Sequence, residues 1–535
     1  MHRLAVALLC SIGICPSINA EVFQIPPNGE GDSFPAIALA IAASEQSDDM
    51  SNVIQFGAGD YFISKSIRIR NIGAAGFVKG SERYGLLSDG KQLEFRGAGM
   101  DLTTIRIPVD NHAPNPMFVF DGVDHCKISE LTLDGQVRLF NGQGWGRGPT
   151  RKRPSCGVFL FGAQHCHFQN VRFRDLGMSD TSETSEPVPS GANLVMACVE
   201  SDESVGNYLP GHVNRALLRN EHREIVSPGI GRSCFDNKIS ACEFVDDPST
   251  ELPNPCTNFA IRMLTNWTST KYAEPHEAQH TALSALVKEN LIEDCSFSGG
   301  YFWNAVEIAG HGSVYNKVLR CKFNRCIQTP ADIDKAASFN LFEDNDIIDT
   351  YARSIETRRA MGVTSLGTWT FAMRMQGYPS LNKGRRGREA IGNQFINNRI
   401  NGVYGNTRAT GAMLLSRTVD AVIRDNELQS VPRWATEEGQ NYSGPEEGTA
   451  AIKIRSWVKN IEISNNRLPH SIVDEAPRQN FSAIMEFSES GPTSAEIPDL
   501  PRARENATIH QDITIVDYER GEKGSKSRFD WKVGS

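Results

Sequence analysis

Acidic residues alternate with apolar ones in three short segments near the middle of the chain. They are Glu307 in NAVEIAG, Asp332 and Asp334 in ADIDK, and Glu356 in SIETR. Successive side chains of an extended strand point to opposite faces, so the carboxylates would share one face and the apolar residues the other. Two neighbouring carboxyl groups can act as proton donor and as base or nucleophile, because crowding of like charges raises one pKa. This pattern is typical of glycosidic-bond hydrolysis.

In a hydrolase we expect Glu307 to donate the proton, Asp332 or Asp334 to serve as base or nucleophile, and Glu356 to tune their pKa values. This reaction needs no cofactor. We favour hydrolysis, and the alternative use of the same carboxylates is to bind Ca²⁺, which prefers oxygen ligands. In a calcium-assisted lyase, the metal and a cation would acidify the proton beside a uronate carboxylate, and Lys, Arg or His would remove it. A third possibility is a glycan-binding protein or adhesin whose carboxylates are ordinary solvated charges.

Basic and aromatic residues accompany the acidic segments. Two copies of one strand pattern, FAIRM and FAMRM, carry Arg262 and Arg374. Local basic patches in a net-acidic protein favour a polyanionic chain with carboxylates or sulfates, and aromatic rings can stack on sugar faces. We therefore expect an acidic polysaccharide as the partner. The candidate substrate-binding residues are Arg262, Trp303, Arg358, Arg374, Lys453 and Arg455.

A repeat runs through the middle of the chain. It reads Asn, any residue, apolar, two polar, Cys or Asn, any residue, apolar, as in NLIEDCSF from Asn290, NKVLRCKF from Asn316 and NLFEDNDI from Asn340. The spacing of these copies, 26 and 24 residues, indicates a solenoid with coils of about 25 residues. Each copy alternates as a strand does and is followed by turn residues. The pattern predicts an all-β protein, a single-stranded right-handed parallel β-helix with long loop insertions, in which the recurring Cys and Asn stack.

Stacking of the coils would place the acidic residues in one column. Adjacent parallel strands lie about 4.8 Å apart, so carboxylates of neighbouring coils would be separated by about 5 Å and those two coils apart by about 10 Å. We expect Ile308, Ile333 and Leu414 to face inward and their neighbours to face outward. This range of distances covers the geometries of both retaining and inverting glycosidases.

The stretch from about Val53 to Leu468 resembles the pectin-lyase-like superfamily. The segments NVIQFGAGDYFISKSIRI, LEFRGAGMDLTTIRI and ISELTLDG are similar to the opening coils of that superfamily, and FPAIALAIAAS is similar to its N-terminal capping helix. The resemblance implies a parallel β-helix and, for most members, a secreted enzyme that cleaves or remodels polysaccharides. The fold also serves phage tailspikes and adhesins.

One histidine lies close to the acidic column. His311 stands in GHG, a motif that is similar to one in polygalacturonase-like glycoside hydrolases. In those enzymes GHG follows a DD pair and precedes R-I-K, whereas here Asp246 and Asp247 lie more than sixty residues upstream. The resemblance implies a catalytic role for His311, and the alternative is a histidine in a turn.

The ends of the chain and its composition suggest an exported protein. Residues 1–20 carry a basic start, the apolar run LAVALLCSIGIC and a small residue at Ala20, which predicts a signal peptide cleaved there and a secreted or periplasmic location. We expect the β-helix over 21–470 and a C-terminal cap with a polar extension over 471–535. With 64 acidic and 55 basic residues, a nucleic-acid partner is not expected, and no later segment suggests a membrane span. Some cysteines outside the repeat, among them Cys156, Cys234 and Cys326, could pair.

Overall fold

The computed structural model describes most of the repetitive region and leaves gaps at the longer loops. The described residues are 20–71, 85–87, 91–108, 116–136, 156–176, 192–199, 227–245, 259–265, 285–298, 304–326, 328–351, 370–377, 389–405, 410–429, 433–434, 450–455, 458–467, 482–487 and 510–516. No helix in these ranges is long and apolar enough to cross a membrane.

The strands form three sheets, and every pairing between described strands is parallel. A twelve-stranded sheet contains β4(Ile67–Asn71), β5(Gly85–Leu87), β8(Phe118–Asp121), β10(Cys156–Phe161), β12(Ala192–Ala197), β16(Phe259–Leu264), β20(Asn304–Ala309), β24(Ala331–Asp334), β27(Thr370–Gln376), β31(Thr410–Ser416), β36(Ala450–Arg455) and β38(Ser482–Phe487). A three-stranded sheet contains β13(Cys234–Phe235), β17(Val287–Lys288) and β21(Ser313–Val314). A twenty-four-stranded sheet contains β1(Glu21–Ile25), β2(Ser51–Phe56), β3(Gly59–Phe62), β6(Gln92–Arg96), β7(Thr103–Arg106), β9(Cys126–Asp134), β11(His167–Arg174), β14(Lys238–Ser240), β15(Glu243–Val245), β18(Leu291–Glu293), β19(Ser296–Ser298), β22(Lys317–Leu319), β23(Lys322–Asn324), β25(Leu341–Glu343), β26(Asp346–Tyr351), β28(Ala390–Ile391), β29(Gln394–Ile396), β30(Arg399–Gly405), β32(Thr418–Val419), β33(Val422–Arg424), β34(Glu427–Gln429), β35(Arg433–Trp434), β37(Val458–Ser464) and β39(His510–Val516).

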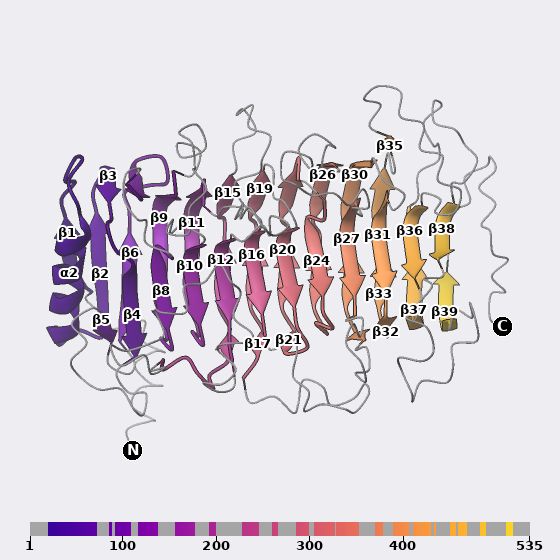
Figure 1. Ribbon diagram of the computed structural model, residues 1–535, viewed down its shortest axis with the longest axis horizontal. Coiled ribbons are helices and arrows are strands. Elements are labelled where there is room, and N and C mark those ends of the chain that lie inside the picture. The colour runs from indigo at the N-terminus through magenta and orange to yellow at the C-terminus, as the bar shows by residue number, and fades with distance from the viewer. Residues whose placement is uncertain are drawn as a thin grey trace, which may run out of the picture.

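Successive coils stack along the long axis of the molecule, as Figure 1 shows from the indigo to the yellow end. One coil runs through β20, β21, β22 and β23, and the next begins at β24, which pairs with β20. In the same way β22 pairs with β25, and β23 pairs with β26. The fold is therefore the parallel β-helix that the repeat and the pectin-lyase-like resemblance predict.

The first coil is covered by the helix α2(Phe34–Gln46), which lies at the indigo end in Figure 1. It carries Pro35 in its first turn and buries Ile37, Ala40 and Ile41. This is the segment that resembles a capping helix. At the other end, β38 pairs with β36 and β39 pairs with β37, so strands stack in parallel beyond residue 470 as well, within the range expected for the C-terminal cap.

Asparagine side chains hold the coils in register. Asn316 donates from Nδ2 to the carbonyl of Val287 (3.0 Å) and to Oδ1 of Asn340 (3.1 Å), and its own Oδ1 accepts from the backbone N–H of Asn290 (3.1 Å). Equivalent bonds link Asn237 to Asn290 and Asn340 to Asn393. A second ladder continues through Asn345, Asn398, Asn426 and Asn466. These ladders satisfy backbone groups at bends that regular strand pairing leaves open.

In the interior, residues of the same type stack on one another from coil to coil. Phe173, Phe244, Phe297 and Phe323 stack with ring centroids 4.7–4.8 Å apart. The recurring Cys242, Cys295 and Cys321 are buried free thiols, as the repeat predicts. The thiols of Cys156, Cys234 and Cys326 are also buried and free, so the pairing considered for them does not occur.

The ladder generates a prediction about stability. Asn316→Ala leaves the backbone N–H of Asn290 and the carbonyl of Val287 buried without their side-chain partner. Each unsatisfied group costs about 1–3 kcal/mol, so we expect a clear fall in the urea midpoint of unfolding. The matched control is Lys317→Ala, an exposed neighbour, which we expect to change the midpoint little. Equal midpoints for the two variants would show that the ladder does not stabilise the coils.

Candidate functional site

Three of the predicted acidic residues, Glu307, Asp332 and Asp334, lie on the outer face of the twelve-stranded sheet. Strand register places Arg262 of β16 beside Glu307 of β20, Glu307 beside Asp332 of β24, and Asp332 beside Arg374 of β27. The intervening Ile308 and Ile333 belong to the interior core. Asp334 lies two residues after Asp332 and therefore on the same face. The alternation of apolar and charged residues in the sequence was therefore enough to predict that two acids and two arginines, from four successive coils, share one row.

These side chains form a network of ion pairs. Arg374 binds Asp332 through two bonds, from Nε to Oδ1 (2.6 Å) and from the terminal nitrogen Nη2 to Oδ2 (2.5 Å). The Nε of Arg262 donates to Oε2 of Glu307. Such charge-assisted bonds are stronger than neutral ones and fix the planes of both groups.

Lys335 completes the network. Its Nζ lies 3.6 Å from Oε1 of Glu307 and 3.9 Å from Oδ2 of Asp334, and Nη2 of Arg374 lies 3.6 Å from the same Oδ2. We refer to Arg262, Glu307, Asp332, Asp334, Lys335 and Arg374 as the charged cluster. It balances three cations against three carboxylates.

The charged cluster has a buried centre and a partly open rim. Glu307 is 3% exposed and Asp332 is 0% exposed. The side chains of Arg262, Asp334, Lys335 and Arg374 keep 14–17% of their surface accessible. A ligand that approaches this face therefore meets three cations and Asp334 before it reaches the other two carboxylates.

The surroundings of the two buried carboxyl groups, Glu307 and Asp332, shift their pKa values in opposite directions. Burial alone would raise the pKa of Glu307, but Arg262 and Lys335 outweigh it and lower the pKa to about 2. Burial raises the pKa of Asp332 to about 7, against the opposing effect of Arg374 and with a contribution from the neighbouring carboxylates of Asp334 and Glu307. Glu307 is thus fully ionised at neutral pH, whereas Asp332 holds a proton for part of the time.

The carboxylates do not fit a calcium site. Glu307, Asp332 and Asp334 each offer an oxygen within 4.8 Å of the others, a spacing that a metal could bridge. However, Arg262, Lys335 and Arg374 already pair with these carboxylates. Ca²⁺ requires about six to eight oxygen ligands, and here it would meet three positive charges at contact distance.

The other predicted site residues have different places. His311 is buried in the turn after β20. In this turn Gly310 has φ +92°, and a Cβ there would come within 2.6 Å of Thr265 Oγ1, so the first glycine of GHG serves the turn itself. Trp303, Glu356 and Arg358 lie outside the described residues. The position beside Asp332 in the column, where Glu356 was expected, is occupied by Arg374. Lys453 and Arg455 lie on β36, with Lys453 in register with Leu414.

Two features of the site were not predicted from the sequence. Lys335 was missed because it follows the end of β24 in a left-handed turn conformation (φ +55°), where alternation no longer applies. Leu414 was expected inside but lies outside, in register with Arg374, while Met413 and Leu415 face the core. The reason is that MLL is apolar at three successive positions, so periodicity does not say which of them faces the interior.

Apolar side chains border the charged cluster at both ends. On the outer face, Val119, Phe159 and Val195 precede Arg262 in the same row and form a buried cluster of their own. Beyond Arg374, Leu414 packs with Phe371, and both are buried. Among the described residues of this row, the charged cluster is therefore separated by apolar residues from the next charged positions, Arg68 on β4 and Lys453 on β36.

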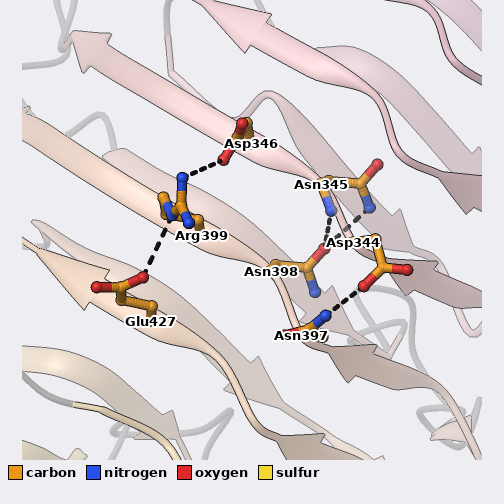
Figure 2. Close-up of a pocket in the computed structure, with 7 residues that line it drawn as sticks. All are labelled: Asp344, Asn345, Asp346, Asn397, Asn398, Arg399 and Glu427. Atoms are coloured by element: carbon orange, nitrogen blue, oxygen red, sulfur yellow. Dashed lines mark hydrogen bonds and ion pairs between the residues drawn. The ribbon is translucent and has the colours of Figure 1, made fainter.

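A separate hollow of about 260 Å³ lies on the twenty-four-stranded sheet and contains none of the predicted site residues. Figure 2 shows Arg399 between Asp346 and Glu427, with Asn345 and Asn398 of the second ladder to their right. The polar groups of this hollow are already joined to one another. We assign it no function and use it as a source of control variants.

Comparison with known proteins gives similar solved structures and no matching family. No protein-family model matches the chain, and no curated protein matches its sequence. Among solved structures it is similar to the A-module of the mannuronan C-5 epimerase AlgE4 of Azotobacter vinelandii, at 13% identity and a TM-score of 0.39 over 87% of this chain and 95% of that one.

Two further solved structures have similar values. The surface adhesin PfbA of Streptococcus pneumoniae matches at 10% identity and a TM-score of 0.44, over 93% of this chain and 92% of that one. The endo-xylogalacturonan hydrolase of Aspergillus tubingensis matches at 11% identity and a TM-score of 0.39, over 91% and 98%. The three names cover an epimerase, an adhesin and a hydrolase. The fold assignment rests on the parallel strand pairing of this chain itself.

The raised pKa of Asp332 predicts how stability depends on pH. The folded protein binds a proton at Asp332 up to about pH 7, whereas the unfolded chain releases it near its ordinary pKa of 3.8. The stability that the folded state gains from binding this proton is complete below pH 3.8 and is lost as the pH rises through 7. The side chain of Asn cannot titrate. We therefore expect the thermal midpoint of Asp332→Asn to rise relative to that of the wild type as the pH increases from 5 to 8.

Glu427→Gln is the matched control, because Glu427 lies in the hollow on the other sheet and away from Asp332. The hydrogen bond from Gln429 and the charge of Arg399 lower the pKa of Glu427 below its ordinary value of 4.5, so its contribution is complete above pH 4.5 and is lost only in acid. We expect a constant difference from the wild type between pH 5 and pH 8. A constant difference for Asp332→Asn as well would contradict the raised pKa of Asp332.

Proposed function

We propose that the protein is an exported enzyme that cleaves an acidic polysaccharide by hydrolysis at the charged cluster. The observation that carries the proposal is a pair of carboxyl groups in adjacent coils, Glu307 and Asp332, whose pKa values lie far apart at about 2 and about 7. Carboxyl groups that differ in this way are suited to separate acid and base roles. Export, which residues 1–20 predict, is part of the same proposal.

The roles differ from those expected from the sequence. Asp332 is the proton donor in this proposal, because its raised pKa keeps a fraction protonated at neutral pH. Both of its oxygens are covered by Arg374, so the substrate reaches Asp332 only by drawing this guanidinium aside. Asp334 is the base or nucleophile, since it is the carboxylate on the open rim. Glu307 stays ionised and helps to keep the pKa of Asp332 high. Oxygens within 4.8 Å of each other are closer to the retaining arrangement, about 5–5.5 Å, than to the inverting one.

The cations of the rim favour an anionic substrate. Arg262, Lys335 and Arg374 are held by buried or rim carboxylates, so their directions are set before a ligand arrives. Preorganised cations lose little conformational entropy when they bind a carboxylate or a sulfate. Trp303 and Arg358 remain candidate contacts for the sugar.

A calcium-assisted lyase is the second candidate. It would use the same carboxylates as metal ligands, but these already have cationic partners. A non-catalytic glycan-binding protein is the third candidate and requires no protonated carboxyl group. The three candidates give different products, so one assay separates them.

The first test is an activity screen of residues 21–535 on polygalacturonate, alginate and chondroitin sulfate. We expect new reducing ends without new ultraviolet absorbance, and no effect of a chelator. Asp332→Asn should lower the rate about 10²- to 10⁴-fold, the usual contribution of a general acid. Arg399→Gln, which changes the hollow on the other sheet, should leave the rate unchanged. Absorbance that a chelator abolishes would support the lyase, and binding without cleavage would support the glycan-binding protein.

The second test is the pH dependence of the rate. A donor with a pKa of about 7 predicts activity that falls about tenfold per pH unit above neutrality. Glu307→Gln removes a negative neighbour and should move this decline to lower pH, because the pKa of Asp332 drops. A decline at the same pH in Glu307→Gln and in the wild type would exclude Asp332 as the donor that Glu307 tunes.

A further inference from the structure

The charge balance of the cluster has a consequence for ligand binding. Asp332 has Arg374 as its bidentate partner, and its other charged neighbours on this face include the carboxylates of Glu307 on β20 and Asp334 on its own strand. Arg262 and Lys335 are directed to Glu307, and Lys335 also to Asp334. The positive charge at Asp332 therefore comes mainly from Arg374.

The guanidinium of Arg374 is also the part of this pair that a ligand can reach. Its side chain is partly exposed, whereas Asp332 is completely buried. A sugar carboxylate that binds Arg374 adds a fourth negative charge to three carboxylates and three cations. Away from water, an uncompensated charge is costly, and protonation of a carboxylate removes it.

We propose that the charged cluster binds the carboxylate of a uronic acid at Arg374 together with one proton from solvent, which Asp332 takes up. This inference rests on the proposed function and names its substrate class, a polysaccharide with uronic acid residues. Asp332 is the acceptor because it is the most buried carboxylate and shares Arg374 with the ligand. Its raised pKa makes the uptake easy near neutrality.

The proton uptake would couple recognition to catalysis. A neutral sugar brings no negative charge to Arg374 and leaves Asp332 as it is. An acidic sugar increases the protonated fraction of the group that must donate the proton. Selectivity for uronates would then lie in the catalytic step as well as in binding.

Calorimetric titration of the wild type tests the inference directly. The probes are D-galacturonate and D-glucuronate, which are ionised throughout the range used, with D-galactose as the neutral control. Titrations at pH 8 in Tris and in imidazole, whose ionisation enthalpies differ, give the number of protons bound. We expect about one proton per uronate at pH 8, fewer at pH 5, and an association constant that falls about tenfold per pH unit above pH 7.

Asp332→Asn is the decisive variant, because it keeps the shape of the side chain and cannot take up a proton. It should bind uronate with no proton uptake and no dependence on pH from 7 to 8, while Arg399→Gln should behave as the wild type. No uptake by the wild type at pH 8, undiminished uptake by Asp332→Asn, or no binding of either uronate would overturn the inference. Hydrolysis without uptake would reject only this inference, and uptake without hydrolysis would reject only the proposed reaction.

Discussion

Parallel pairing between successive coils is the constraint on which the rest of the structure depends. It brings residues that are 25 to 45 positions apart in the chain side by side, as with Glu307 and Asp332 or Arg262 and Glu307. The backbone hydrogen bonds of the sheets and the asparagine ladders fix this register. On the outer face, aligned positions of successive coils therefore form rows of side chains, and the residue type at each position determines the chemistry of the row. The charged cluster consists of four members of one such row, together with Asp334 at the end of β24 and Lys335 in the turn that follows.

Within that row the neighbours of each carboxyl group decide its chemistry. Glu307 and Asp332 are both almost completely removed from water, yet the cations beside Glu307 outweigh its burial and those beside Asp332 do not. A buried ion pair adds little net stability, because desolvation of the charges offsets their attraction. Six charges kept on one face of a β-helix are therefore better explained by a demand for charge at that place than by a need for stability.

The sequence predicted the coils and most of the row, and its failures have physical reasons. Glu307, Asp332 and Arg374 were placed on one face because each stands between residues that can only be interior. Leu414 was misplaced because both of its neighbours are apolar, and Lys335 was overlooked because it lies in a turn. The roles of Glu307 and Asp332 could not be ordered, since a pKa depends on distances to Arg262, Lys335 and Arg374 that no sequence spacing contains.

The asparagine ladder has a consequence for the evolution of the chain. The bond from Asn316 to Asn340 spans 24 residues and that from Asn340 to Asn393 spans 53, yet their lengths are 3.1 and 3.2 Å. The length of the hydrogen bond between two ladder asparagines therefore does not depend on the number of residues between them. Insertions can lengthen or replace the segment between two successive ladder asparagines and leave every row of side chains in place. The surroundings of the charged cluster are in this sense free to diversify by insertion and deletion, while the cluster itself changes only by substitution.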